Sequence, residues 1–348
     1  MAATQAKQPR NQALECFKFL AAISIVYLHV ALPGRAGKLV DCLSRFAVPL
    51  FFAISGYFAY GARCGKLGRR FWHVVKLNLL ASFSLVLWDC LWAASCGGSA
   101  ADVLRSSIPS VNQLINWFFF HGSPFRGHLW YLAAIAACYA VLIVYVGFFG
   151  DEAINYRPLY TLGAALFCIR FAATDMLSRA GLTIPFYLFR DGWFTGIPMF
   201  SLGIFLRQYQ ARLIQNYRLT TARLIGLFLI GVALSLMQYY ALGSSELPIG
   251  AVIQVIALLL LSTRYPVIDG GLRPVRAVIS CLGFLSTVIY IYQFCAYDFY
   301  ARFFAGPVAG LMGGLEIYVR PLMISLCAAA AGLAVLAVRH IIRRATAK

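Results

Sequence analysis

Glu15, Lys18 and His29 are the residues near the start of the chain whose types and spacing could do chemistry. They lie in one apolar run, in which ten residues separate Lys18 from His29. On an α-helix, eleven steps come to three turns plus about 20°, so both side chains share a face and lie roughly 16 Å apart along the axis. Titratable groups are costly inside a bilayer, so such a pair indicates a functional site if the helix spans one.

His29 and Glu15 each have two interpretations. A neutral imidazole at His29 could take a proton from a hydroxyl as a general base, or it could be a packed, hydrogen-bonded histidine. Glu15 lies one turn before Lys18, which favours an ion pair that positions the lysine over a direct catalytic role. The two residues alone do not decide between these interpretations.

The composition is that of an integral membrane protein. Of the 348 residues, 61% are hydrophobic and only 12% are charged, whereas soluble globular chains carry about 25% charged residues. Apolar runs extend from residue 13 to residue 338, which leaves no room for a separate soluble domain. The first run is long, contains Lys18 and lacks a small-residue cleavage pattern, so we expect a retained span rather than a signal peptide.

The apolar runs predict an all-α, polytopic bundle of about ten transmembrane helices. Their expected ranges are 13–32, 44–61, 71–95, 128–149, 158–174, 192–208, 221–241, 248–263, 276–301 and 318–340. The polar start and aromatic end of 112–120 indicate a segment lying at the membrane interface. We expect one transmembrane domain over 13–340 between basic cytoplasmic tails at 1–12 and 341–348.

The net charge of +18 does not indicate nucleic-acid binding, because the basic residues form short clusters between apolar runs rather than one patch. Lys and Arg are enriched in the cytoplasmic loops of membrane proteins. With the N-terminus inside, about two thirds of the 30 Lys and Arg residues fall on the cytoplasmic side. We therefore expect both termini in the cytoplasm and a multi-pass protein of the plasma membrane, in contact with the lipid bilayer.

The ten cysteines are scattered, mostly inside apolar runs, with no CxxC pair and no Cys/His pair at metal-ligand spacing. Free cysteine behaves as a small buried hydrophobic residue. We expect no metal site and no permanently bound cofactor.

Five phrases, in the right order, resemble the membrane-bound acyltransferase-3 family, whose members acylate sugars, lipids and peptides at the cell envelope. The family opens with an acidic residue, an arginine, ten residues and a histidine, which Glu15, Lys18 and His29 resemble. Its helix 2 phrase is similar to Phe-Ala-Val-Pro-Leu-Phe-Phe-Ala-Ile-Ser-Gly-Tyr at 46–57. The later phrases begin at His128-Leu-Trp130-Tyr131, Arg190-Asp-Gly-Trp and Ser286-Thr-Val-Ile-Tyr290. Within the family, the chain looks closest to the membrane portion of vancomycin-resistance serine racemases, without the racemase domain.

The resemblance implies an O-acyltransferase that moves an acyl group from coenzyme A to a hydroxyl, and the expected acyl group is acetyl. The acceptor would be an unidentified envelope carbohydrate, lipid or small molecule. The expected catalytic residues are His29, as the general base, and Glu15, the acidic member of the motif. The expected binding residues for the donor are Lys18, Arg69, Arg70, His73 and Lys76, and those for the acceptor are Ser55, Tyr57, His128, Trp130, Arg190 and Gln293.

Several of these residues have simpler roles open to them. Ser55 with Gly56 permits the close approach of two helices. The phrase at His128 could be an interfacial anchor within an aromatic belt, and Arg190 with Asp191 could be a pair that reaches the interface.

The chain departs from the family pattern at three places: Lys18 replaces an arginine, His73 with Lys76 replaces a stronger basic pair, and Gln293 replaces a histidine. A lysine binds phosphate without the bidentate fork of arginine, and a glutamine cannot shuttle protons. The alternative to acyl transfer is therefore a transporter or substrate-binding membrane module of the same fold, for example for amino-acid uptake. A basic cavity at Lys18 that leads toward His29 would favour the enzyme.

Overall fold

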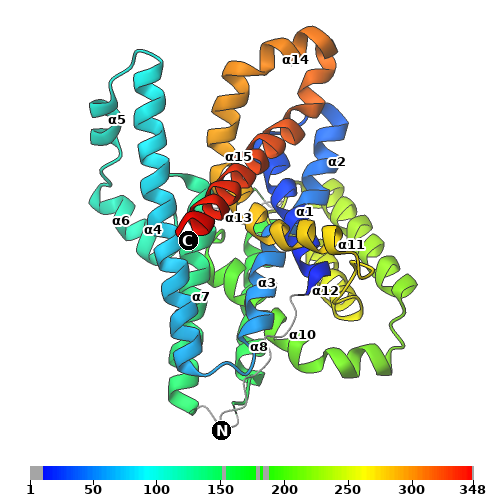
Figure 1. The fold of residues 1–348 in the computed structure, drawn as a ribbon. Helices are drawn as coiled ribbons and strands as arrows, with labels where there is room; N and C mark the ends of the chain where they lie inside the picture. Colours follow the sequence, from blue (N-terminus) through cyan, green and yellow to red (C-terminus); the bar gives the residue numbers. More distant parts are fainter. Residues whose placement is uncertain (1–10, 151–153, 178–180, 183–187, 347–348) are drawn as a thin grey trace.

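The computed structural model describes residues 11–150, 154–177, 181–182 and 188–346, and every regular element within these ranges is helical. Figure 1 shows a bundle of long helices, with α1 (Gln12–His29) near its middle. Helices satisfy backbone N–H and C=O groups internally, which lipid requires of a spanning segment. The predicted all-α membrane bundle is confirmed.

Each of the ten predicted helices has a counterpart. They are α1, α3 (Ala47–Ala59), α4 (Cys64–Ser95), α7 (Trp130–Phe149), α8 (Arg157–Phe171), α10 (Ile197–Asn216), α11 (Thr221–Leu242), α12 (Ile249–Arg264), α13 (Arg273–Phe303) and α15 (Glu316–Thr346). A 3₁₀ turn, η1 (Gly127–Leu129), precedes α7, and π-helical turns follow α8 (η2, Ala172–Met176) and precede α10 (η4, Gly192–Gly196). Helix α15 runs to Thr346 and so includes part of the expected C-terminal tail; the N-terminal tail lies outside the described residues except for its last two positions.

Four short helices were not predicted: α2 (Gly34–Ser44), α5 (Ala100–Ser106), α6 (Val111–Phe120) and α14 (Ala305–Met312). None is long enough to stand out in a hydropathy pattern. Helix α6 does carry a local signal, a capping box in which Ser110 and Gln113 bind each other's backbone N–H groups. It covers the predicted interfacial segment and exposes 76% of Phe118, while its position at the interface stays a prediction.

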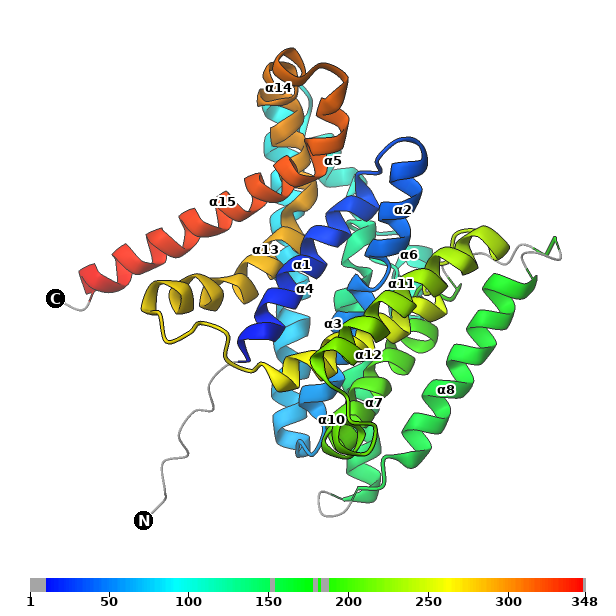
Figure 2. The same ribbon diagram turned by 90° about the vertical axis from the view of Figure 1, so that its right-hand side faces the viewer.

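Eight helical segments of the described chain are long and apolar enough to cross a membrane. Helix α12 has only 16 residues, and the second half of α10 carries Arg207 and Arg212. In Figure 2, α1, α3, α4 and α7 lie in the body of the bundle, while α8 stands at one side. The number of spans and the cytoplasmic side of the termini stay predictions.

Glycines allow α3 and α10 to pack with their backbones in contact. A Cβ atom added at Gly203 would lie 1.9 Å from the carbonyl oxygen of Ala53, and one at Gly56 would lie 1.9 Å from that of Phe200. Both distances are far inside van der Waals contact, so only glycine fits at either position. This contact fixes α3, and with it the residues that α3 presents to the two cavities described below.

The substitution Gly203→Ala should therefore destabilise the protein. Overpacking of this kind costs about 1–3 kcal/mol, so we expect a clearly lower melting temperature in thermal unfolding of the detergent-solubilised protein. Gly226→Ala is the matched control, because nothing lies within 4 Å of a Cβ at that position in α11 and alanine is the better helix former. Equal melting temperatures for the two variants would contradict the contact.

Candidate active site

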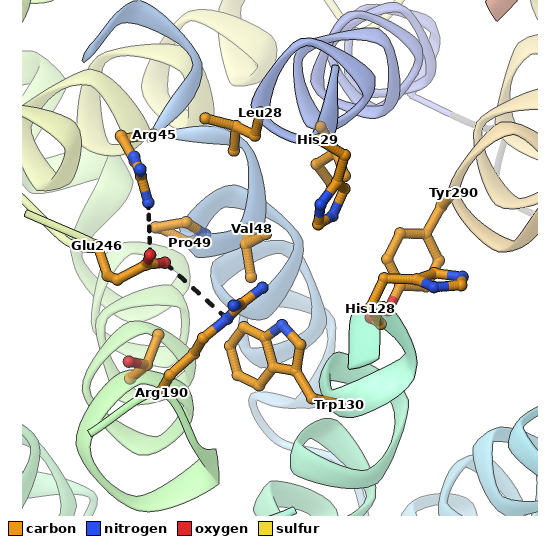
Figure 3. Close-up of a pocket in the computed structure, with 12 residues that line it drawn as sticks. Leu28, His29, Arg45, Val48, Pro49, His128, Trp130, Arg190, Glu246 and Tyr290 are labelled. Atoms are coloured by element: carbon orange, nitrogen blue, oxygen red, sulfur yellow. Dashed lines mark hydrogen bonds and ion pairs between the residues drawn. The ribbon is translucent and has the colours of Figure 1, made fainter. Parts of the chain in front are cut away.

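One polar cavity of about 120 Å³ lies at the C-terminal end of α1, and we call it the His29 cavity. Its walls come from α1, the start of α3, the start of α7, η4, the α11–α12 loop and α13. They are formed by Ile25, Leu28, His29, Arg45, Val48, Pro49, His128, Trp130, Arg190, Thr195, Glu246 and Tyr290. Figure 3 shows the two histidines on one side of this cavity and a charged cluster on the other.

The two histidines share an aromatic support. Their ring centroids are 6.4 Å apart, and the ring of Phe294 lies 5.4 Å from His29 and 4.8 Å from His128. His29 is the last residue of α1 and is accessible from the cavity. His128 is buried, with 3% of its surface exposed, and its Nε2 lies 3.0 Å from the carbonyl oxygen of Ile291.

A chain of ion pairs forms the opposite wall. Glu246 binds the Arg45 guanidinium at 2.8 Å and lies 3.9 Å from Nε of Arg190. Arg45 also holds Asp41 at 2.8 Å, and the guanidinium of Arg190 lies 5.4 Å from the centre of the Trp130 ring. The carboxylate of Glu246 thus ties α2, α3 and the segment before η4 to the α11–α12 loop.

Glu246 stays ionised at neutral pH. Burial opposes its ionisation, but the charges of Arg45 and Arg190 and the hydrogen bond from Arg45 outweigh burial and hold the pKa of this carboxyl below its ordinary value.

His121 and Asp191 position the η4 turn. Asp191 caps the turn by accepting a hydrogen bond from the backbone N–H of Phe194 at 2.8 Å. The N–H of Gly192 donates to Nδ1 of His121 at 3.2 Å. Burial lowers the pKa of His121 to about 4, so this imidazole is neutral and can accept. These bonds fix the backbone that carries Arg190 and Thr195 into the His29 cavity.

A second polar region lies at the N-terminal end of α1, where two adjoining hollows share Lys18, Phe58, Lys66 and Arg70. We call them together the basic cavity. Their basic side chains are Lys18, Lys66, Arg69, Arg70, His73 and Arg207, and Glu15 is the acidic residue among the lining.

Several of these side chains have fixed partners. Lys18 and Glu15 form the expected ion pair, at 3.0 Å. Arg207 donates to the hydroxyl of Tyr57 at 3.0 Å, and this hydroxyl donates to Gln210 at 2.6 Å. The pair of Glu15 and Lys18 indicates that Glu15 positions the lysine.

An aromatic contact lies between the two cavities. Tyr131 lines the basic cavity and Tyr290 lines the His29 cavity, and their ring centroids are 5.7 Å apart. The hydroxyl of Tyr290 donates to the carbonyl oxygen of His128. The cavities are therefore neighbours separated by the thickness of side chains.

The structure divides the predicted site residues between the two cavities. His29, His128, Trp130 and Arg190 line the His29 cavity, whereas Glu15, Lys18, Ser55, Tyr57, Arg69, Arg70 and His73 line the basic cavity. Ser55 and Tyr57 were expected at the acceptor, but α3 runs from the His29 cavity toward the basic cavity, and these residues lie at its far end.

Two predicted site residues, Lys76 and Gln293, line neither the His29 cavity nor the basic cavity. Lys76 is exposed on α4. Gln293 is buried and donates to the carbonyl oxygen of Tyr290 at 2.9 Å. Sequence reasoning missed Arg45, Thr195, Arg207 and Glu246. Arg45 directly precedes the helix 2 phrase, which is the signal that could have drawn attention to it; Glu246 stands in a short loop without a motif.

Residues 11–339 match the model of the acyltransferase-3 family, described as an acyltransferase domain. The chain belongs to the acyltransferase-3 family. No curated protein and no solved structure matches it. As an acyltransferase-3 protein it is a multi-pass membrane enzyme that transfers acyl groups other than aminoacyl groups. The finer likeness to the membrane portion of serine racemases stays a prediction.

Glu246→Gln should lower the stability of this acyltransferase in a pH-dependent way. The pKa of Glu246 is lower in the folded protein, so its contribution is complete above the unfolded pKa of about 4.3 and is lost as pH falls through the folded pKa. We expect the melting temperature of the wild type to exceed that of the variant by a constant margin from pH 8 to about pH 6. The margin should shrink below about pH 4, and a margin that persists unchanged at pH 3 would contradict this assignment.

Proposed function

We propose that the protein is an O-acyltransferase of the plasma membrane. It would take an acyl group, which we expect to be acetyl, from coenzyme A in the basic cavity and pass it to a hydroxyl in the His29 cavity. One observation carries the proposal: two polar cavities lie at the two ends of α1 and meet at Tyr131 and Tyr290.

The basic cavity suits the phosphates of coenzyme A. Lys18, Lys66, Arg69, Arg70 and Arg207 bring positive charge to one place from α1, α4 and α10. Charge-assisted hydrogen bonds from guanidinium and ammonium groups to phosphate are strong and specific. Acyl-coenzyme A is a cytosolic metabolite, so this cavity would face the cytoplasm, the side that the Lys and Arg bias predicts for these segments.

The length of α1 suits the remainder of the donor. Lys18 and His29 are separated by roughly 16 Å along the helix axis, a distance that a long, thin pantetheine arm can cover. With its phosphates at the basic cavity, the thioester would lie near Tyr131 and Tyr290, where small side-chain rotations would open a path to His29.

His29 would supply the base. Its imidazole would take the proton of the acceptor hydroxyl, and the hydroxyl oxygen would attack the thioester carbonyl carbon. Collapse of the tetrahedral intermediate would break the C–S bond and expel the coenzyme A thiolate, which receives the proton from His29. An ester and free coenzyme A are the products, and the imidazole returns to its neutral form.

The acceptor would be an envelope carbohydrate, lipid or small molecule whose polar groups meet Trp130, Thr195 and the Arg45–Glu246–Arg190 wall. A transporter built on this fold would not require a cationic donor cavity next to a histidine cavity, and the family assignment favours transfer.

His29→Ala should abolish turnover. Loss of a general base lowers rates by about 10²–10⁴-fold, so release of thiol from acetyl-coenzyme A by the purified protein, in buffer or with envelope extracts, should fall by at least a hundredfold. His340→Ala is the control, because His340 is exposed on α15 and lines neither cavity. Turnover that persists unchanged in His29→Ala would contradict the proposed role of this residue.

Arg207→Gln should weaken coenzyme A binding. A hydrogen bond to a charged group contributes about 1.5–3 kcal/mol, so we expect its Kd, measured by calorimetry, to rise about tenfold or more. Arg212→Gln on the same helix serves as the control, since Arg212 is exposed and lines neither hollow. Equal affinities for the two variants would place the donor elsewhere.

A further inference from the structure

We infer that the indole N–H of Trp130 is the hydrogen-bond donor that stabilises the oxyanion formed when the acceptor hydroxyl attacks the thioester. This inference rests on the proposed function, in which His29 is the base and the thioester reaches the His29 cavity. It also refines that function: the acceptor meets the rest of the indole ring, while the N–H serves the carbonyl oxygen of the donor. Trp130 touches a reacting atom in this account and is therefore a catalytic residue.

The indole of Trp130 is held in one orientation inside the bundle. Only 6% of the residue is exposed, so it is not an interfacial anchor that presents its N–H to lipid head groups. The Phe52 ring packs 6.0 Å from the indole, centroid to centroid, and the guanidinium of Arg190 lies 5.4 Å from the centre of the indole ring. These contacts fix the ring before a substrate enters, as a preorganised donor requires.

The N–H of this indole faces the cavity without a partner. An indole nitrogen is only a donor, and a buried tryptophan usually gives its N–H an acceptor. Nε1 of Trp130 has no acceptor among the described residues, yet it is not one of their sealed, unpartnered polar atoms. Figure 3 shows the nitrogen edge of the ring turned toward the middle of the cavity. This donor is therefore available to an atom that enters the cavity.

Two hydroxyls of the same wall are already committed to the protein. The hydroxyl of Thr195 donates to the carbonyl oxygen of Phe189 at 2.8 Å. The hydroxyl of Tyr290 donates to the carbonyl oxygen of His128. Neither can serve a substrate without giving up its acceptor, whereas the N–H of Trp130 gives up nothing.

The position of Trp130 on α7 places this donor beside the path of the thioester. Trp130 lines the His29 cavity and the next residue, Tyr131, lines the basic cavity, so the two residues span the junction that the donor crosses. The His29 cavity measures only about 120 Å³, which is space for roughly ten waters. A thioester carbonyl in so small a space lies between the base and the indole N–H.

The N–H acts when negative charge forms. The hydroxyl oxygen attacks the thioester carbon as His29 takes the proton, and the electron pair of the C=O bond moves onto the carbonyl oxygen. This oxyanion accepts the hydrogen bond from Trp130, which transfers no proton. The positive charge of Arg190 over the ring makes the N–H a stronger donor and favours the anion. Collapse restores the C=O bond and breaks the C–S bond, and the thiolate takes the proton from His29.

Trp130→Phe tests the inference, because phenylalanine keeps a ring between Phe52 and Arg190 but has no N–H. Removal of one oxyanion donor lowers kcat by about 10²–10³-fold. We expect kcat for acetyl-coenzyme A turnover to fall about a hundredfold or more with KM within about twofold, since the lost bond forms only in the transition state. The Kd of coenzyme A, measured by calorimetry, should also stay within about twofold of the wild type.

A second replacement separates the hydrogen bond from the packing. Benzothienylalanine at position 130 keeps the shape of the indole and carries sulfur in place of the N–H, so kcat should fall by the same factor. Trp88→Phe is the matched control, because Trp88 donates its own N–H to Asp298 at 3.1 Å and lines neither cavity. All rates are measured below the melting temperature of each variant.

The inference is overturned if kcat of Trp130→Phe or of the benzothienylalanine variant stays within about threefold of the wild type, or falls no more than in Trp88→Phe. It is also overturned if a higher concentration of envelope extract restores the wild-type rate, because the N–H would then bind the acceptor in its ground state. A wild type without His29-dependent turnover would instead overturn the proposed function, and the inference with it.

Discussion

The cost of placing polar groups in a bilayer is the constraint on which the rest of this structure depends. Helix α1 carries Glu15 and Lys18 at one end and His29 at the other, and its apolar middle packs on α13, α3 and α15. Each polar end therefore has to open into a cavity where its groups find partners. The two cavities follow from this need, and Tyr131 and Tyr290 form the apolar contact between them.

The His29 cavity is held by bonds that arrive from distant parts of the chain. Glu246 ties Arg45 to Arg190 from a loop, His121 holds the η4 turn, and Phe294 sets the spacing of the two histidines. None of these side chains is adjacent to His29 in the sequence. The site is thus a product of the whole bundle, although only one helix supplies its base.

The sequence predicted the parts that depend on local pattern. Each of the ten apolar runs has a helix as its counterpart in the described part of the chain, and the spacing from Lys18 to His29 placed these residues on one face of α1. The direction of α3 already implied that Ser55 and Tyr57 lie far from His29. The resemblance to the family's helix 2 phrase nevertheless led us to expect both residues at the acceptor. Glu246 and Arg207 could not be found, because pairing between the α11–α12 loop and Arg45, in a turn 201 positions away, or between Arg207 and Tyr57, leaves no periodic signal. Lys76 lies two turns beyond Arg69 on the same face of α4, where it is exposed and does not line the cavity.

A structure of the protein with coenzyme A bound, determined by electron cryomicroscopy in a lipid nanodisc, tests the central claim most directly. The account predicts phosphate density against Lys18, Arg69, Arg70 and Arg207, with the thiol end at Tyr131 and Tyr290 and directed toward His29. Coenzyme A bound with its phosphates outside the basic cavity, or with its thiol end pointing away from α1, would contradict it.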